Sequence, residues 1–247
     1  QLSTDCRLTH PEGTGATFRP YKFDGDDFIE LLGWYITEGS TYWPEGERTA
    51  SVKIAQENAA GRESIRDLFE SLNLDPSVDD QGFTIGSSIY AYVLENLCGS
   101  GSENKRIPEM VFNEASQSQK QLLLETLIEG DGDSSGKYYT ISDNLKDDVV
   151  RLCVELGISP MVQKRRGTWE IMTSHVEDGF ETYTDTVSKS ATDNGVYCVT
   201  VEDNHTLLAG RNGKFQFVGQ SLYGVTGWDR FRLYDKEGAA AVTATGR

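Results

Sequence analysis

The strongest constraint on the fold is an internal repeat built around two apolar segments that each end in an acid followed by glycine. The segments are FIELLGWYITEGS (residues 28–40) and LLLETLIEGDGDSSG (residues 122–136). Aligning Glu38 with Asp131 also places Gly33 opposite Thr126. Because recurrence of a long segment indicates a repeated supersecondary unit, the chain is expected to contain two copies of one unit.

The stretches after the two segments keep the same order. Each acid is followed by a candidate strand, then by an amphipathic helix with a matching end, then by a hairpin-like stretch. The strands are expected at 49–55 and 137–142, the helices at 63–76 and 147–160, and the hairpin stretches include 82–86 and 161–172. This alternation predicts an α+β fold.

A calcium-binding loop is a second interpretation of the GDGD sequence. Asp131, Asp133, Ser135 and Gly136 match the first, third, fifth and sixth places of an EF-hand loop. The twelfth place, which needs a bidentate Glu, holds Ser142. The segment after the loop is aromatic and β-branched, which indicates a strand where an EF-hand has its second helix. Asp133 is therefore expected to be a turn residue.

The charge of the chain is unusual for a protein of 247 residues. There are 39 acids and 23 bases, a formal net charge of -16, and the acids are spread along the whole sequence. Diffuse acidity on a chain with many apolar residues is not the signature of disorder. It fits a protein that stays soluble in concentrated salt, as in a halophile, with an ordinary acidic protein as the alternative.

Cysteine spacing and hydropathy limit the cellular setting. The chain has no run of 18 apolar residues and no basic-plus-apolar leader, so we expect neither a membrane span nor a secretion signal. The four cysteines, Cys6, Cys98, Cys153 and Cys198, lack metal-ligand spacing and are expected to be reduced packing residues. Both observations favour a cytoplasmic protein.

The two segments and the sequence between them resemble a known family. LLGWYITEG and LETLIEGDG are similar to the two motifs of a monomeric, two-repeat LAGLIDADG (DOD-type) homing endonuclease. KRIPEMVF (residues 105–112) is similar to the Lys-x-Ile-Pro element before the second motif of endonucleases housed in inteins. The sequence departs from the family pattern at Thr126, where Gly is usual, and at Glu38, where Asp is commoner.

The resemblance implies two αββαββα-like repeats related by a pseudo-two-fold axis. Gly33 and Thr126 would let the two motif helices approach, and Glu38 and Asp131 would meet at their ends and bind Mg2+, with Mn2+ as an alternative. This metal site would serve phosphodiester hydrolysis. Lys105 would polarise the attacking water or offset phosphate charge. Lys189 is a weaker candidate for the same role in the second repeat.

The family likeness also implies that the two sheets bind double-stranded DNA in the major groove. QKRRGTW (residues 163–169) is a locally basic and aromatic stretch, and its Lys164, Arg165 and Arg166 are candidates for contacts with phosphates or guanine edges. The alternative is a solvated hairpin tip.

A second resemblance lies downstream, in VYCVTVEDNHTLLAGRNGKFQFVGQS (residues 196–221). As plain sequence it is two β-rich runs around a polar turn. It is similar to the C-terminal end of a Hint-type intein, with His205 as the segment histidine, Gln220 as the last intein residue and Ser221 as the first host residue. The side-chain amide of residue 220 would cyclise and the hydroxyl of residue 221 would carry the upstream chain. Gly219 replaces the usual penultimate His, and Cys198 takes a place often held by Asp.

The C-terminal residues resemble a different protein. SLYGVTGWDRFRLY and TATGR are similar to the Asn-Ser-x-Tyr-Gly and T-x-x-G-R elements of family B DNA polymerases. The expected organisation is a linker and remnant of the upstream splicing half (1–23), an endonuclease domain (24–190, repeats about 24–106 and 107–190), a splicing segment (191–220) and a polymerase stub (221–247). The upstream intein half and the host polymerase are the expected partners, and splicing is expected only with that half.

Two further functions remain open at this level. The motif helices of a decayed endonuclease would act only as a DNA-binding or structural module within the intein. A polymerase segment proper would need palm-domain aspartates and exonuclease acids that we do not find in the sequence.

Overall fold

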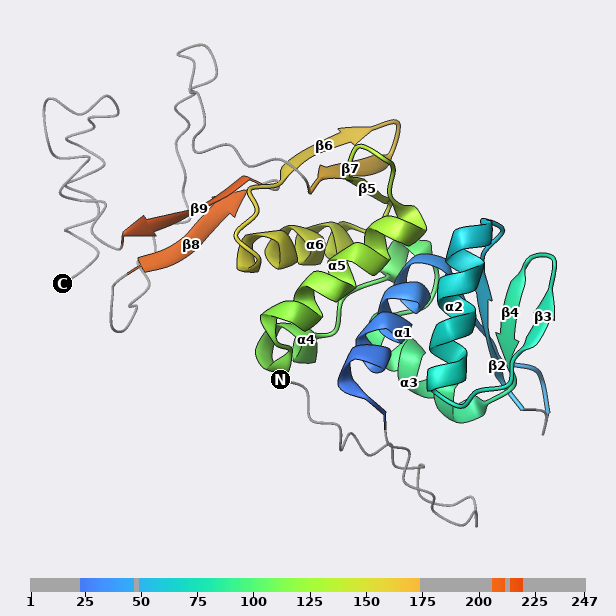
Figure 1. Cartoon of the computed structure of the whole chain (residues 1–247). Coiled ribbons are helices and arrows are strands. Elements are labelled where there is room, and N and C mark those ends of the chain that lie inside the picture. The colour runs from blue at the N-terminus through green and yellow to red at the C-terminus, as the bar shows by residue number, and fades with distance from the viewer. Residues whose placement is uncertain (1–22, 47–48, 174–205, 212–213, 220–247) are drawn as a thin grey trace, which may run out of the picture. The chain divides into compact units, whose positions relative to one another are not determined.

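The computed structural model describes residues 23–46, 49–173, 206–211 and 214–219 (Figure 1). The chain divides into two compact units, residues 1–176 and residues 177–247. The first unit contains both copies of the repeat. The predicted domain boundaries within the chain stay predictions.

The first repeat has the element order α-β-β-α-β-β-α. Its elements are α1 (Gly25–Glu38), β1 (Gly39–Tyr42), β2 (Ser51–Ala55), α2 (Ala59–Ser71), β3 (Ser77–Asp79), β4 (Gly82–Ile85) and α3 (Ser88–Cys98). The four strands form an antiparallel sheet in the order β1-β2-β4-β3. Helices α1 and α3 contact β2, so the inward side chains Val52 and Ile54 are buried.

The second repeat follows a connection with a short 3-10 turn (Ser102–Asn104) and helix α4 (Glu109–Glu114). Its elements are α5 (Gln117–Asp131), β5 (Lys137–Thr140), α6 (Asp143–Glu155), β6 (Met161–Arg165) and β7 (Thr168–Met172). The sheet order β5-β7-β6 repeats the order β2-β4-β3 of the first sheet. The α+β fold and the duplicated unit are therefore confirmed.

The second repeat differs from the predicted αββαββα order because it has no full counterpart of β1 in the described residues. Only an isolated bridge between Gly132 and Tyr138 stands at that place. The Asp133 carboxylate accepts hydrogen bonds from the backbone N–H groups of Ser135 and Lys137 and from the Tyr139 hydroxyl. These bonds close a tight turn, so the chain reverses before a strand can form. Asp133 is thus a turn residue.

The two amphipathic helices begin and end earlier than the predicted ranges 63–76 and 147–160. The side chains of Asn58 and Ser142 cap the first turns of α2 and α6. After each helix one residue adopts a left-handed conformation, Asn73 with φ 51° and Gly157 with φ 78°. This conformation ends the helix and leaves Pro76 beyond it. The matching ends predicted for the two helices are thus confirmed, with shifted boundaries.

Helices α1 and α5 pack side by side and run in the same direction (Figure 1). Near their first turns the Gln119 side-chain amide donates to the Asp26 carboxylate at 3.0 Å. At mid-helix a Cβ atom on Gly33 would lie 2.7 Å from Thr126 Cγ2. One turn later a Cβ on Gly130 would collide with Thr37. Each pair has the same offset in numbering as Glu38 and Asp131, so the sequence alignment matches the packing in space.

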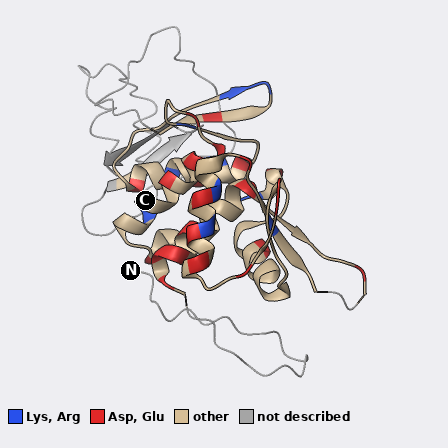
Figure 2. Cartoon of the chain, turned by 45° about the vertical axis from the view of Figure 1, so that its right-hand side comes forward, with Lys and Arg blue, Asp and Glu red and all other residues tan. Residues whose placement is uncertain are grey.

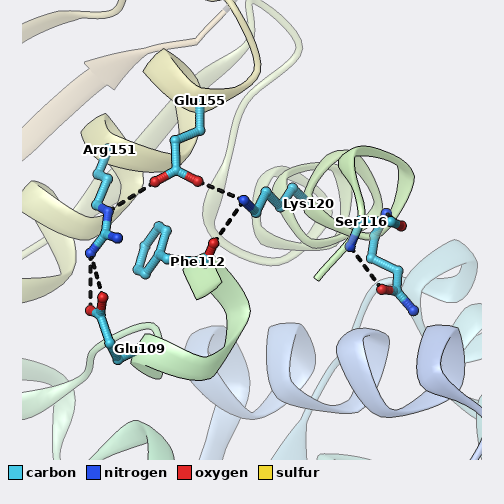
Figure 3. A network of polar contacts seen from close by, with 7 residues as sticks. Glu109, Phe112, Ser116, Lys120, Arg151 and Glu155 are labelled. Atoms are coloured by element: carbon cyan, nitrogen blue, oxygen red, sulfur yellow. Dashed lines mark hydrogen bonds and ion pairs between the residues drawn. The ribbon is translucent and has the colours of Figure 1, made fainter. Parts of the chain in front are cut away.

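A buried lysine joins α4, α5 and α6 (Figure 3). Lys120 Nζ donates to the Phe112 carbonyl oxygen at 2.9 Å and to the Glu155 carboxylate at 2.7 Å. Arg151 also contacts Glu155, forms two bonds to Glu109 and lies 4.0 Å from the centre of the Phe112 ring. The network fixes the second repeat on the side away from its sheet.

Replacing Lys120 with Met is expected to lower the free energy of unfolding by about 2 kcal/mol, because a half-buried Glu155 loses its ammonium partner. The control is Lys53→Met, since the Lys53–Asp79 pair is longer, 3.6 Å, and more exposed. That change should cost less than about 0.5 kcal/mol. Urea denaturation in molar KCl measures both values, and equal effects would contradict a structural role for the Lys120 network.

Two of the four cysteines lie in the described part of the chain. Cys98 and Cys153 are buried free thiols whose pKa burial raises to about 12, so they are packing residues, as predicted. Cys6 lies outside the described residues.

Among the helices of the described part, none is long and apolar enough to cross a membrane. In the second unit, β8 (Thr206–Arg211) and β9 (Lys214–Gly219) form an antiparallel hairpin.

Candidate active site

Glu38 and Asp131 are the last residues of the two parallel helices, and each is followed by an extended glycine. A Cβ atom on Gly39 would lie 2.5 Å from the Tyr35 carbonyl oxygen, and a Cβ on Gly132 would collide with the Ile128 carbonyl oxygen. Only glycine therefore lets the chain turn sharply away from the helix directly after the acid. The acid-glycine pairs of the sequence are the points at which both helices end.

The two carboxylates share one electrostatic environment. Burial and, to a smaller extent, the Glu38 charge raise the pKa of Asp131 to about 7, with the Lys105 charge acting in the opposite sense. Burial also raises the pKa of Glu38. An acid at a helix C-terminus faces the negative end of the helix dipole, and here two such ends lie together. The site therefore concentrates negative potential and favours a bound cation.

Lys105 provides positive charge beside this pair. Its side chain is only 4% exposed, and its Nζ donates to the carbonyl oxygens of Tyr35 and Gly39 at the end of α1. Nζ also lies 3.5 Å from the centre of the Tyr35 ring. Burial lowers the pKa of Lys105 to about 8, while Asp131 raises it. An ammonium has three N–H donors, so one remains beyond these two bonds.

A cavity of about 290 Å³ joins Lys105 to Asp131. Its lining also includes Thr37, Gly39 and Tyr139, which come from both repeats. The structure thus brings together Lys105, Asp131 and, through its charge, Glu38, three of the four residues predicted to be catalytic. Lys189 lies outside the described residues.

The segment that carries Lys105 is held by α6, a feature that the sequence alone did not predict. The Ser142 hydroxyl, which caps α6, donates to the Lys105 carbonyl oxygen at 2.8 Å. Two residues later, the Ile107 N–H donates to the Asp148 carboxylate at 2.9 Å. On the other side, the Arg106 N–H donates to the Cys98 carbonyl oxygen. The second repeat therefore fixes the lysine against the helix end of the first.

Asp148, which accepts the bond from Ile107, makes the stability of the folded protein depend on pH. Burial raises its pKa to about 6, with smaller contributions from Asp147 and Glu109, while the bond from Ile107 and the charge of Arg151 act in the opposite sense. The ordinary value is 3.8, so the folded protein binds more protons than the unfolded chain between these pH values. The contribution of Asp148 to stability is therefore present at low pH and is lost as the pH rises through about 6.

Asp148→Asn is expected to remove the loss of stability above about pH 6, because an amide oxygen still accepts the hydrogen bond from Ile107 but carries no charge. The free energy of unfolding at pH 7.5 should rise by about 1 kcal/mol, a value reduced for partial solvent screening. At pH 4 the gain should vanish. Urea denaturation at both pH values measures the difference, and parallel pH profiles for the two proteins would contradict the assignment.

The basic side chains predicted to contact DNA, Lys164, Arg165 and Arg166, lie at the tip of the β6–β7 hairpin (Figure 2). Side chains alternate along β6, so Lys164 lies on the face that packs on α6, where it forms an ion pair with Asp143 at 3.6 Å. Arg165 projects to the opposite face, near Glu170. Arg166 is exposed in the turn with φ 51°. The acidic residues are spread over the helices (Figure 2).

The predicted splicing residues His205, Gln220, Ser221 and Cys198 lie outside the described residues. In the described part, sequence reasoning missed Tyr138, whose fully buried hydroxyl has no hydrogen-bond partner there. No motif marks this residue. Its place in the strand directly after the second acid was the only available signal.

The donor set of the site bears on whether a divalent metal could bind. In the described ranges no cluster of three or more His, Cys, Asp or Glu side chains could enclose an ion. Two carboxylates at paired helix ends are nevertheless hard oxygen ligands that leave coordination positions open, a combination that suits Mg2+. Their buried, mutually repelling charges would be relieved by a cation. The residues present therefore fit a metal that is shared with other ligands.

Comparisons with known proteins give low-identity similarities. No protein-family model matches the chain. It is 25% identical, over an alignment 303 positions long, to a DNA polymerase of Thermococcus hydrothermalis, covering 94% of this chain and 18% of that protein. It is 26% identical over 292 residues to a DNA polymerase of Thermococcus litoralis, covering 90% of this chain and 17% of that protein.

Solved structures match the chain at lower identity still. A variant of the homing endonuclease I-DmoI, bound to its target DNA in the presence of Mg, matches with TM-score 0.45 and 16% identity, covering 60% of this chain and 88% of that chain. The N-terminal LAGLIDADG domain of DUF199/WhiA matches with TM-score 0.41 and 12% identity, covering 62% and 76%. In sequence, the chain is similar to DNA polymerases over most of its own length and spans less than a fifth of theirs.

Proposed function

We propose that this chain is the C-terminal part of an intein that contains a LAGLIDADG homing endonuclease. It would make Mg2+-dependent double-strand breaks at the uninterrupted gene of its host, a family B DNA polymerase. The observation that carries the proposal is the pair of helix-terminal acids, Glu38 and Asp131, with the buried Lys105 beside them.

Each residue of the site has a part in phosphodiester hydrolysis. Glu38 and Asp131 would hold the metal ion, which would supply an activated water and stabilise charge on the leaving oxygen. Ligands from outside the protein would complete its coordination, because the described residues contain no cluster of three or more His, Cys, Asp or Glu side chains. Lys105 uses two N–H groups to fix the end of α1, and it also lines the cavity that Asp131 borders. There it offsets the charge that develops on phosphate.

DNA binding is assigned to the sheet faces that lie away from the helices. On the first sheet this face carries Ser40, Lys53 and Thr84 in one row across neighbouring strands. On the second it carries Tyr139 and Arg165. The turn residue Arg166 adds a positive charge. Lys164 must break its ion pair with Asp143 before it can reach DNA.

The net charge of -16 fits this function in a concentrated-salt cytoplasm. There the release of counterions contributes little to DNA affinity. Shape and base contacts would then supply most of the affinity.

The host assignment is supported by the extent of the sequence similarity. The polymerase-like tail, residues 221–247, is a small part of the chain. The match to polymerases nevertheless covers 94% of the whole chain. Those polymerases therefore contain a stretch similar to the duplicated region as well. An intervening element inside a polymerase has this arrangement. The splicing roles of His205, Gln220 and Ser221, with assistance from Cys198, belong to the same proposal.

The test is cleavage of a supercoiled plasmid that carries the uninterrupted polymerase sequence, in molar KCl with Mg2+. We expect one double-strand break in that sequence and none when the chain's own coding sequence interrupts it or when EDTA replaces Mg2+. A folded chain that leaves the plasmid intact would overturn the nuclease proposal in favour of a decayed endonuclease retained as a DNA-binding or structural module.

A further inference from the structure

Tyr138 lies on β5, the strand that follows Asp131, and its side chain has an unusual environment. Its side chain is fully buried on the inward face of β5, opposite Ile171 in the register of the sheet. Its hydroxyl is the one buried side-chain polar atom in the described residues without a hydrogen-bond partner. A buried tyrosine hydroxyl normally finds a partner, so an unpaired one requires a reason.

The backbone of Tyr138 is paired with the residue next to Asp131. The bridge between Gly132 and Tyr138 places β5 alongside the residue that directly follows Asp131. Burial raises the pKa of Tyr138 well above 10, and the charges of Asp131 and Glu38 raise it further. A tyrosine hydroxyl is protonated at neutral pH, so it can donate a hydrogen bond to an ionised carboxylate.

We propose that Tyr138 is a positioning residue of the metal site, whose hydroxyl donates a hydrogen bond to the Glu38–Asp131 pair when that pair holds a divalent cation. The inference rests on the proposed function, since it assumes that these two acids bind the metal. Tyr138 acts through the carboxylates and does not touch the metal.

The physical basis is the strength of a hydrogen bond to an ionised acceptor. A carboxylate that binds a cation is ionised, and a bond from a neutral donor to an ionised oxygen is about twice as strong as one between neutral groups. Hydrogen bonds of this kind orient metal-binding carboxylates, and loss of one typically costs about 10- to 100-fold in metal affinity. The Tyr138 hydroxyl has no partner among the described residues and would gain one when a cation keeps both carboxylates ionised.

A core tyrosine that only fills space gives a different expectation. Tyr138→Phe would then leave metal affinity unchanged. If the hydroxyl positions the carboxylates, the same change should weaken metal binding while the metal-free protein keeps its stability, because no existing hydrogen bond is lost. The combination of weaker binding and unchanged stability separates the two roles.

The experiment measures Mn2+ affinity of the full chain by electron paramagnetic resonance in molar KCl, together with the thermal midpoint of the metal-free protein. The native chain is compared with Y138F and with the double variant E38Q/D131N. The matched control is Y90F, which removes the hydroxyl of a buried tyrosine that packs on Phe23, next to the first turn of α1 and away from Glu38.

We expect E38Q/D131N to abolish Mn2+ binding, Y138F to weaken it at least about tenfold with an unchanged or higher thermal midpoint, and Y90F to leave it unchanged. Native-like Mn2+ affinity in Y138F would overturn the inference and leave the metal site in place. A Y138F protein that is unfolded without metal would also overturn it, because the hydroxyl would then have had a partner. Mn2+ binding that is absent in the native chain, or unchanged in E38Q/D131N, would overturn the metal site and this inference together.

Discussion

Glu38→Gln and Asp131→Asn are each expected to lower the rate of DNA cleavage about a thousandfold or more. Each change removes one of two anionic ligands from a site that has no third clustered carboxylate in the described residues. Stability should not fall with activity. Asp131 has its pKa raised to about 7 by burial and by Glu38, so a neutral amide in its place relieves repulsion in the metal-free protein.

Glu30→Gln is the matched control for this prediction. Glu30 lies on the same helix, about two turns before Glu38, and it accepts a bond from the Trp34 indole. Its substitution removes one negative charge from α1 but leaves the paired helix ends intact. Cleavage at the native rate by Glu30→Gln, with loss in the other two variants, supports the assignment. Full cleavage by Glu38→Gln would rule out a metal held between the two acids.

Gly33→Ala is expected to lower the free energy of unfolding by about 3 kcal/mol, at the upper end of the usual cost of overpacking. The added Cβ would lie 2.7 Å and 2.8 Å from two atoms of Thr126. The Thr126 side chain is held by its hydroxyl, which donates to the Leu122 carbonyl oxygen at 2.9 Å, so it cannot simply rotate away. The two helices must separate, and this separation also moves the acids at their ends.

The exchanged pair Gly33→Ala with Thr126→Gly tests the cause. It keeps a single Cβ at the helix crossing, so the double variant should be more stable than the sum of the two single changes predicts. Gly86→Ala is the control, because a Cβ at Gly86 meets no atom within 4 Å. Denaturation in molar KCl measures all four variants. A Gly33→Ala protein as stable as the native chain would contradict close packing of the motif helices.

The sequence predicted the features that depend on local pattern and on duplication. The motif helices, the strands after them and the pairing of Gly33 with Thr126 all follow from one alignment, because a repeated unit buries its apolar face against its copy. The structure contains these helices and strands and places the Gly33 backbone against the Thr126 side chain.

Other features depend on contacts between distant segments and could not be predicted. The turn of Asp133 removes a strand from the second repeat through side-chain hydrogen bonds. Ser142 and Asp148 clamp the Lys105 segment across the repeats. The isolated hydroxyl of Tyr138 becomes visible only when burial is known. For Lys164, alternation along the strand placed the side chain on the helix face, where Asp143 binds it.

The most direct measurement of the central claim is the anomalous scattering of Mn2+ in crystals of the chain bound to its target DNA. We predict a peak within coordination distance of both Glu38 and Asp131, and its absence from crystals of the Glu38→Gln, Asp131→Asn double variant. A well-ordered complex in saturating Mn2+ with no peak beside either carboxylate would contradict the account, because the paired helix ends would then not be a metal site.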